Sequence, residues 1–383
     1  MRTLTVLAAA ALTATTGAAF EKIALVDSFD FHGSAGFDIE TPAGTEKVLD
    51  HVLLTGADTV LWRNMSGALP RYPSAEEARP AKEPPLDLRR LPLNERDRGW
   101  VRWDFPKTNL LMHAGWAARR RGKGYGIHVP FEENHGEAWT WGAWNLERPQ
   151  FWGCPKGGVP WAGAASKTHP EVMAHKLRLM DEILFDGVDT VFLDLLRAGS
   201  WSPAREAASV ETVRTAVRDY IRGIRARCDA TGRKVRLLIG LPHVSLGEKT
   251  DYTLAQCGVD WRAFAADGTV DGLVLMAVFP RPGRDIWQET RDVYAHVMRN
   301  RGRAKVYFPV AEYGWNSGIP QYCKATGLSK AQVAGRLMAM AAEAGADGIT
   351  LECVDYGNYT PEMCAAIRDF KPNGNTTTKG ERK

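Results

Sequence analysis

The chain has 383 residues, of which 44% are hydrophobic and 25% are charged, so it is long enough to bury a large core. Its 49 Lys and Arg residues and 45 Asp and Glu residues leave a formal net charge of only +4. A balance this close to neutral gives no support for nucleic acid as a partner.

The first nineteen residues differ in composition from the rest of the chain. Arg2 supplies a positive start, residues 4–12 form a short apolar run, and residues 17–19 are small. This layout is typical of a secretory signal peptide and is too short for a membrane span. The sequence therefore predicts a signal peptide over 1–19, a secreted or periplasmic protein, and no membrane span in the mature chain. The alternative is a frayed N-terminus.

From residue 20 onward, a strand followed by a helix recurs eight times. The expected strands are short apolar runs, typical of a parallel sheet buried on both faces, at 22–26, 58–62, 124–130, 189–193, 234–241, 271–278, 305–310 and 347–351. The expected helices are 45–54, 107–120, 170–185, 207–228, 261–266, 285–301, 330–344 and 361–370. Long segments at 67–104 and 131–167 follow the second and third strands.

Eight repeated units favour closure into a barrel over an open sheet. Several helices end in a glycine before the next strand, as at Gly56 and Gly345, which is typical of a left-handed helix cap. We therefore expect a single (β/α)8 TIM barrel over residues 20–371, with long loops after strands two and three. The polar residues 372–383 are predicted to be a disordered tail. The alternative is a doubly wound open sheet.

Six cysteines occur in the chain, and export would permit disulfides between them. None of them forms a CxxC pair, so a zinc or thioredoxin-type site has little support. They are expected to be small buried hydrophobic residues or to form a structural bridge whose pairing the sequence leaves open.

Three carboxylates directly follow apolar strands, where the active sites of barrel enzymes lie. They are Asp194, Glu312 and Glu352. Hydrolysis of a glycoside needs two carboxyl groups, one to protonate the leaving oxygen and one to attack or to activate water. The sequence predicts that Asp194 is catalytic and is paired with Glu312 or Glu352. The alternative for each is an ion pair with an arginine of the barrel mouth, such as Arg63 or Arg197.

Other polar and aromatic residues near the ends of the strands are predicted to bind substrate. They are Arg63, His128, Glu132, Trp141, Arg197, His243, Trp315 and Asp355. Residues 132–161 contain five tryptophans, Trp139, Trp141, Trp144, Trp152 and Trp161. An indole suits the mixed apolar and hydroxylated faces of a sugar. Alternatively, these rings form the core of their own loop.

A small cluster of histidines and glutamates in the third loop could also bind a divalent metal. It consists of His128, Glu132, Glu133 and His135, and its spacing matches no strong metal signature. Hydrogen bonding to sugar hydroxyls or structural pairing is the preferred interpretation. No metal and no cofactor are therefore expected.

Four stretches resemble the bacterial glycosyl-hydrolase-like, family 10-like barrel proteins. They are residues 58–74, 117–128, 169–171 and 187–197. Residues 311–314, Ala-Glu-Tyr-Gly, are similar to the strand-seven nucleophile segment of retaining barrel glycosidases, whose strand four usually carries Asn-Glu. Here strand four carries Leu193-Asp194 instead. The resemblance implies carbohydrate chemistry and active-site roles for Arg63 and Asp194.

The combined prediction is a glycoside hydrolase that acts on an exported or environmental polysaccharide through a carboxylate pair. One alternative is a carbohydrate-binding barrel that keeps the tryptophans but lacks a working acid pair. Another is a metal-dependent hydrolase, such as a deacetylase, that uses the histidine and glutamate cluster of the third loop.

Overall fold

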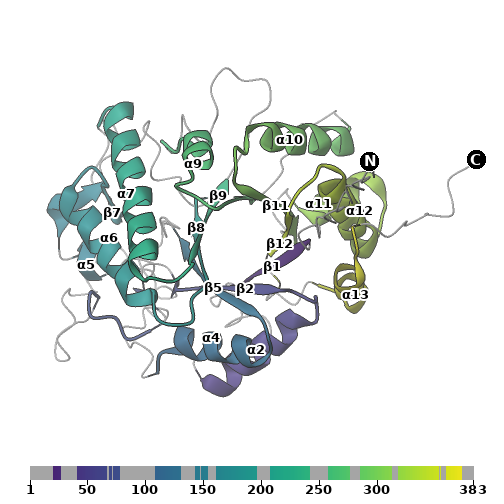
Figure 1. The fold of residues 1–383 in the computed structure, drawn as a ribbon, viewed down its shortest axis with the longest axis horizontal. Helices are drawn as coiled ribbons and strands as arrows, with labels where there is room; N and C mark the ends of the chain where they lie inside the picture. Colours follow the sequence, from purple (N-terminus) through teal and green to yellow (C-terminus); the bar gives the residue numbers. More distant parts are fainter. Residues whose placement is uncertain are drawn as a thin grey trace, which may run out of the picture.

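The structure is a computed structural model. It describes residues 20–26, 41–66, 69–70, 72–77, 108–130, 143–146, 148–153, 161–195, 208–241, 258–276, 285–312, 318–352, 354 and 359–372. In this part of the chain eight strands form a closed parallel barrel in the order β1-β12-β11-β10-β9-β8-β5-β2 (Figure 1). The predicted (β/α)8 barrel is confirmed, and the open-sheet alternative is wrong.

The barrel strands lie close to the expected ranges. They are β1 (Glu21–Val26), β2 (Thr59–Arg63), β5 (Gly124–Pro130), β8 (Thr190–Asp194), β9 (Arg236–Leu241), β10 (Gly272–Leu275), β11 (Lys305–Ala311) and β12 (Gly348–Glu352). Short apolar runs were sufficient to locate them because both faces of a closed parallel sheet are buried.

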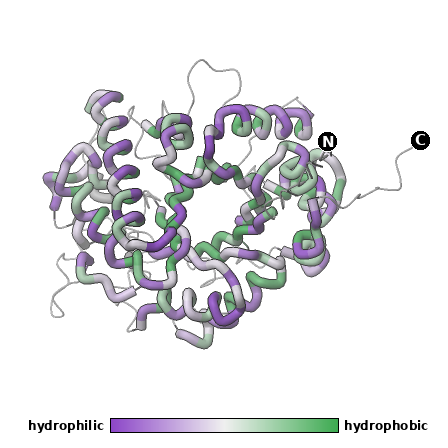
Figure 2. Tube along the Cα trace, viewed as in Figure 1, coloured by the Kyte–Doolittle hydropathy of each residue, from purple (hydrophilic) through white to green (hydrophobic). Residues whose placement is uncertain are grey.

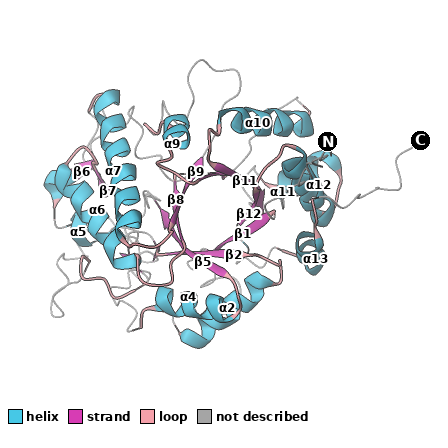
Figure 3. Ribbon diagram, viewed as in Figure 1, coloured by secondary structure: helices cyan, strands magenta, loops and turns pink. Residues whose placement is uncertain are grey.

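A ring of helices surrounds the strands (Figure 3). The helices that follow the eight strands are α2 (Pro42–Leu53), α4 (Leu110–Arg120), α6 (Pro170–Ile183), α7 (Val210–Ala230), α9 (Trp261–Asp267), α10 (Ile286–Asn300), α12 (Lys330–Glu343) and α13 (Pro361–Asp369). Polar caps determine where several of them begin. Helix α7 begins three residues later than expected because the Ser209 side chain accepts a hydrogen bond from the Thr212 amide.

Several short elements in the connecting segments were not predicted. They are the strand pair β3 (Met65–Ser66) and β4 (Leu69–Pro70), helix α5 (Ala143–Leu146), the 3₁₀ turn η3 (Pro149–Phe151), the strand pair β6 (Trp152–Gly153) and β7 (Trp161–Ala165), and helix α11 (Ile319–Thr326). Most are too short to show a hydrophobic period in the sequence.

The buried apolar side chains form two clusters, one on each side of the sheet. The lumen cluster, inside the barrel, consists of Ile23, Leu25, Leu61, Phe192, Leu238, Val274, Met276 and Tyr307. The larger outer cluster lies between the strands and the helices; in it, Phe308 of β11 stacks on Tyr294 of α10 at 3.7 Å between ring centroids. Successive residues of a strand point to opposite sides of the sheet, so they belong in turn to the lumen cluster and to the outer cluster. Figure 2 shows the hydrophobic character of the strands.

The amino-terminal end of the lumen is filled by a polar group that we call the floor network. Glu21 accepts hydrogen bonds from Arg236 at 2.8 and 3.0 Å, from the Tyr307 hydroxyl at 2.8 Å and from the Thr59 hydroxyl at 2.8 Å. Burial raises the pKa of the Glu21 carboxyl, but these bonds and the Arg236 charge outweigh burial and hold it below its usual range. The floor network closes the barrel with a compensated charge pair.

Residues 1–19 and 373–383 lie outside the described residues, so the signal peptide and all but the first residue of the predicted tail lie outside them too. No helix in the described part of the chain is long and apolar enough to cross a membrane. Three cysteines in the described part, Cys228, Cys323 and Cys364, are free thiols, and two of these are buried.

Candidate active site

Two predicted site residues lie at the carboxyl-terminal end of the lumen. On β2, Leu61 belongs to the lumen cluster, so Arg63, two residues further along, faces the lumen as well. On β8, Phe192 belongs to the lumen cluster, and Asp194 follows it with the same spacing. Arg63 and Asp194 are both buried. The strand alternation therefore points both side chains into the end of the barrel where catalysis takes place in this fold.

Two further predicted residues share this orientation. On β5, Ile127 and Val129 belong to the outer cluster, so His128 between them faces the lumen. On β12, Leu351 belongs to the outer cluster, so the next residue, Glu352, faces the lumen. We call Arg63, His128, Asp194 and Glu352 the mouth layer. All four are buried, with exposed fractions between 0% and 4%.

His128 and Asp194 contact each other directly. His128 Nε2 lies 2.9 Å from Asp194 Oδ2, and both side chains are buried. The register places Asp194 opposite Pro130 and His128 opposite Phe192, so the two residues are diagonal neighbours on adjacent strands. The His128 ring also packs on Phe192, at 5.1 Å between centroids. The sheet therefore holds this histidine and carboxylate together on a rigid support.

Glu352 lies on the opposite wall of the barrel from Asp194. The two strands that carry them, β8 and β12, are four strands apart in either direction around the closed sheet. The Tyr359 hydroxyl fixes the end of β12, because it lies 2.7 Å from the Glu352 carbonyl oxygen and 2.8 Å from the Val310 carbonyl oxygen. The mouth layer thus holds two carboxylates across the lumen from one another.

Glu312 has a different environment. It follows β11 at the position that continues the alternation of Phe308 and Val310, which belong to the outer cluster. Its Oε1 lies 2.5 Å from Nζ of Lys330, the first residue of α12. Burial raises the pKa of Glu312, and the ion pair with Lys330 opposes that rise. Glu312 is therefore engaged with a helix outside the barrel, in an ion pair whose partner is a lysine rather than the expected arginine.

The remaining predicted substrate-binding residues lie outside the described residues. They are Glu132, Trp141, Arg197, His243, Trp315 and Asp355. The metal candidates Glu133 and His135 lie outside as well. Among the residues that are described, no three His, Cys, Asp or Glu side chains form a group that could hold a metal ion.

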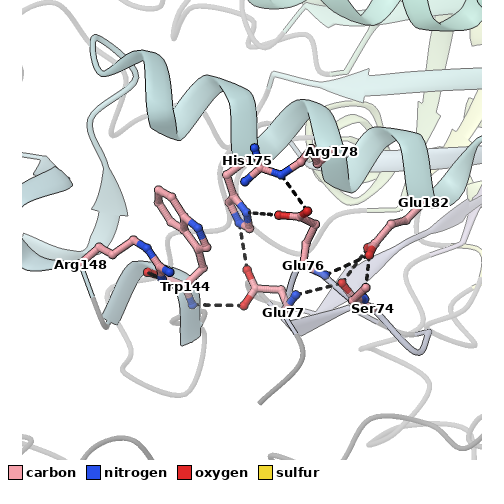
Figure 4. Close-up of polar contacts among 9 residues, drawn as sticks. Ser74, Glu76, Glu77, Trp144, Arg148, His175, Arg178 and Glu182 are labelled. Carbon is pink, nitrogen blue, oxygen red and sulfur yellow. Dashed lines mark hydrogen bonds and ion pairs between the residues drawn. The ribbon is translucent and has the colours of Figure 1, made fainter. Parts of the chain in front are cut away.

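A second buried histidine and carboxylate cluster was missed by the sequence analysis (Figure 4). His175 of α6 lies between two glutamates of the segment after β4, with Nδ1 3.2 Å from Glu76 and Nε2 3.1 Å from Glu77. Trp144 of α5 stacks flat on this ring at 4.2 Å. We call this arrangement the outer clasp.

Further bonds tie the same segment to α6. Glu182 accepts hydrogen bonds from the Ser74 hydroxyl at 2.7 Å and from the backbone amides of Ala75 and Glu76 at 2.7 and 3.0 Å (Figure 4). Arg178 donates to Glu76 at 2.7 Å. Burial raises the pKa of Glu76, but the bonds from Arg178 and His175 outweigh it and hold the pKa below its usual value. The segment after β4 is thus held against α6 by several side chains of that helix.

Comparisons with known proteins support the fold. No protein-family model matches the chain, and no curated protein matches it in sequence. An α-amylase from Geobacillus thermoleovorans in complex with acarbose has a similar structure, with a TM-score of 0.50 and 12% identity over 92% of this chain and 78% of the amylase. The trehalose-6-phosphate hydrolase of Bacillus licheniformis gives a TM-score of 0.50 and 10% identity over 88% of this chain and 64% of that chain.

An α-galactosidase from Thermus thermophilus is also similar, with a TM-score of 0.47 and 16% identity over 92% of this chain. The chain spans 62% of the length of that α-galactosidase. The amylase and the trehalose-6-phosphate hydrolase, at a TM-score of 0.50 and 12% and 10% identity, show a shared barrel architecture and no family membership. The family 10-like resemblance therefore remains a resemblance.

Proposed function

We propose that the chain is a glycoside hydrolase whose carboxylate pair is Asp194 and Glu352. The observation that carries this proposal is the mouth layer, in which two buried carboxylates face one another across the carboxyl-terminal end of the lumen. Burying an ionised carboxylate is costly unless it is paired. A barrel that places two of them at its mouth above an apolar lumen cluster has a site suited to acid–base chemistry.

The spacing across a barrel suits a substrate placed between the two groups. Eight strands about 4.8 Å apart and tilted by about 36° enclose a backbone ring about 15 Å in diameter. Side chains reaching inward from β8 and β12 then leave room for a glycosidic bond between them. One carboxyl group can protonate the leaving oxygen while the other acts at the anomeric carbon. His128 and Arg63 complete the polar surroundings of the pair.

Glu352 is preferred over Glu312 because of the strand alternation. Glu352 shares the lumen side of the sheet with Asp194, whereas Glu312 continues the outward positions of β11 and pairs with Lys330. In the retaining barrel glycosidases that residues 311–314 resemble, strand seven supplies the nucleophile. Here the geometry favours strand eight instead. A polysaccharide outside the cell is the proposed substrate, since the signal-like residues 1–19 favour export.

The proposal is tested by incubating the purified protein with a panel of polysaccharides and analysing the reducing ends that are released. Asp194→Asn should abolish cleavage of the glycan that the wild type cleaves, while its circular dichroism and melting temperature stay close to those of the wild type. Glycan binding without cleavage would contradict the proposal and favour a carbohydrate-binding barrel. Full activity of the Asp194→Asn variant would show that the residue assignment is wrong.

A further inference from the structure

His128 contacts Asp194 through one of its ring nitrogens. Nε2 of His128 lies 2.9 Å from Oδ2 of Asp194, and the side chains are 5% and 1% exposed. Within that contact the only acceptor is the carboxylate oxygen, so the hydrogen is on Nε2 whenever Asp194 is ionised. A hydrogen bond of this kind favours the ionised carboxylate over its acid. This contact gives His128 a route to the chemistry at the mouth through Asp194.

Three polar side chains of the mouth layer surround Asp194 from other strands of the described part of the chain. His128 faces it from β5, Arg63 belongs to the same layer on β2, and Glu352 stands on the opposite wall. On the other neighbouring strand, β9, the lumen position at this level is Gly240, where an added Cβ would meet Phe192 and the Leu195 amide. Gly240 thus contributes no side chain from β9, whereas His128 of β5 contacts Asp194 directly.

We propose that His128 is a positioning residue that keeps Asp194 ionised and oriented, which assigns the proton-donor role to Glu352. This inference rests on the proposed glycosidase function and divides the labour within its carboxylate pair. The bond between the anomeric carbon and the glycosidic oxygen breaks. The leaving oxygen takes the proton of Glu352 and departs as an alcohol.

Water is the second reactant, and its oxygen ends on the anomeric carbon. In a single displacement, ionised Asp194 removes a proton from that water, and the proton then returns to Glu352 through solvent. In a double displacement, Asp194 first bonds the anomeric carbon, and water replaces it after giving a proton to Glu352. Both routes need Asp194 ionised and Glu352 protonated at the start, which is the division that the His128 contact favours.

The test uses two amide variants that differ by one methylene group. His128→Gln can place an N–H near the original Nε2 position, whereas His128→Asn is too short to reach Asp194 in this way. We expect the acidic limb of the pH profile of kcat/KM to move up by about one pH unit in His128→Asn, which lowers kcat/KM about tenfold on the acidic side. The limb of His128→Gln should stay within a few tenths of a unit of the wild type.

A matched control is His175→Asn, which removes the other buried histidine and carboxylate contact, outside the lumen. It should lower the melting temperature and leave the pH profile of kcat/KM in place. An unchanged acidic limb in His128→Asn, or an equal shift in His175→Asn, would overturn the proposal.

A second readout needs no substrate. The carboxyl carbon of Asp194 is followed by ¹³C nuclear magnetic resonance across the pH range and is assigned by its loss in Asp194→Asn. Its titration midpoint should rise by about one unit in His128→Asn and return toward the wild type in His128→Gln. A wild type that cleaves no glycan would refute the glycosidase function, whereas equal midpoints in wild type and His128→Asn would refute the role of His128.

Discussion

The two ends of the barrel lumen both carry charged side chains that are largely shielded from solvent, but they arrange them in opposite ways. At the floor network, one carboxylate, Glu21, is held by Arg236 through two hydrogen bonds and by two hydroxyls. At the mouth layer, two carboxylates stand on opposite walls, with His128 touching one of them. The floor balances one carboxylate against one arginine, which is the composition of a structural pair. The mouth has two carboxylates, with Arg63 and His128 in the same layer, and two carboxyl groups are what glycoside hydrolysis needs.

The largest expected effect separates the two glutamates of the barrel rim. Glu352→Gln should lower kcat about 1,000-fold, or about 4 kcal/mol in activation free energy, because it removes the proposed proton donor. Glu312→Gln should keep kcat within a few-fold of the wild type, since Glu312 pairs with Lys330 on the outer side of the sheet. The measurement is steady-state kinetics on the glycan found in the screen. A loss of activity in Glu312→Gln but not in Glu352→Gln would reverse the assignment to strand seven.

The next effect concerns stability at the floor. Arg236→Leu leaves the largely buried Glu21 without its charge partner, so the free energy of unfolding should fall by about 3 kcal/mol at neutral pH. The pKa of Glu21 is lowered in the folded protein. Ionised Glu21 therefore stabilises the fold fully at a pH above the ordinary pKa of glutamate, and this stabilisation is lost as the pH falls through the lowered pKa.

Urea unfolding of wild type and Arg236→Leu at several pH values measures this effect at the floor. The difference between the two proteins should shrink on acidification, while kcat per folded molecule stays unchanged. If Arg236→Leu lost activity but kept its stability, the floor network would contribute to catalysis, and its contrast with the mouth layer would be wrong.

The outer clasp gives a smaller effect of the same kind. His175→Leu removes both of its contacts with Glu76 and Glu77, and we expect a loss of about 2 kcal/mol in unfolding free energy. Hydrogen–deuterium exchange should show faster exchange in residues 72–77 and in α6 than in the barrel strands. Uniform acceleration across the barrel would instead indicate that the clasp is part of the main core.

The architecture was predictable because it depends on local patterns, whereas the choice of site residues depends on long-range contacts. The apolar runs of β8 and β12 end in Asp194 and Glu352, so the sequence alone was enough to place both carboxylates at strand ends. Glu312 also follows an apolar run, and its different orientation follows from where β11 packs and from the position of Lys330. No short-range pattern links these three acids.

The outer clasp is a stronger example of contacts that short-range sequence patterns do not predict. His175 and its glutamate partners are separated by about a hundred residues, and the segment that carries the glutamates has no hydrophobic period. Trp144 illustrates the consequence, because its composition suits sugar stacking and yet its face is covered by the His175 ring. Residue type predicted which side chains could bind a sugar, and tertiary packing decides which of them are already engaged.

The smallest expected effect tests the ion pair that separates Glu312 from the mouth. Lys330→Met removes the positive partner of a carboxyl whose pKa burial has already raised, so the folded protein binds a proton there more tightly than the unfolded chain. A carboxyl group with a raised pKa stabilises the folded protein at a pH below its ordinary pKa, and this stabilisation is lost as the pH rises toward the raised pKa. Lys330→Met should therefore cost little at acidic pH and at most about 1 kcal/mol at neutral pH, since the lysine is partly exposed. Thermal unfolding at both pH values measures the difference, and a larger cost at acidic than at neutral pH would contradict the ionised pair.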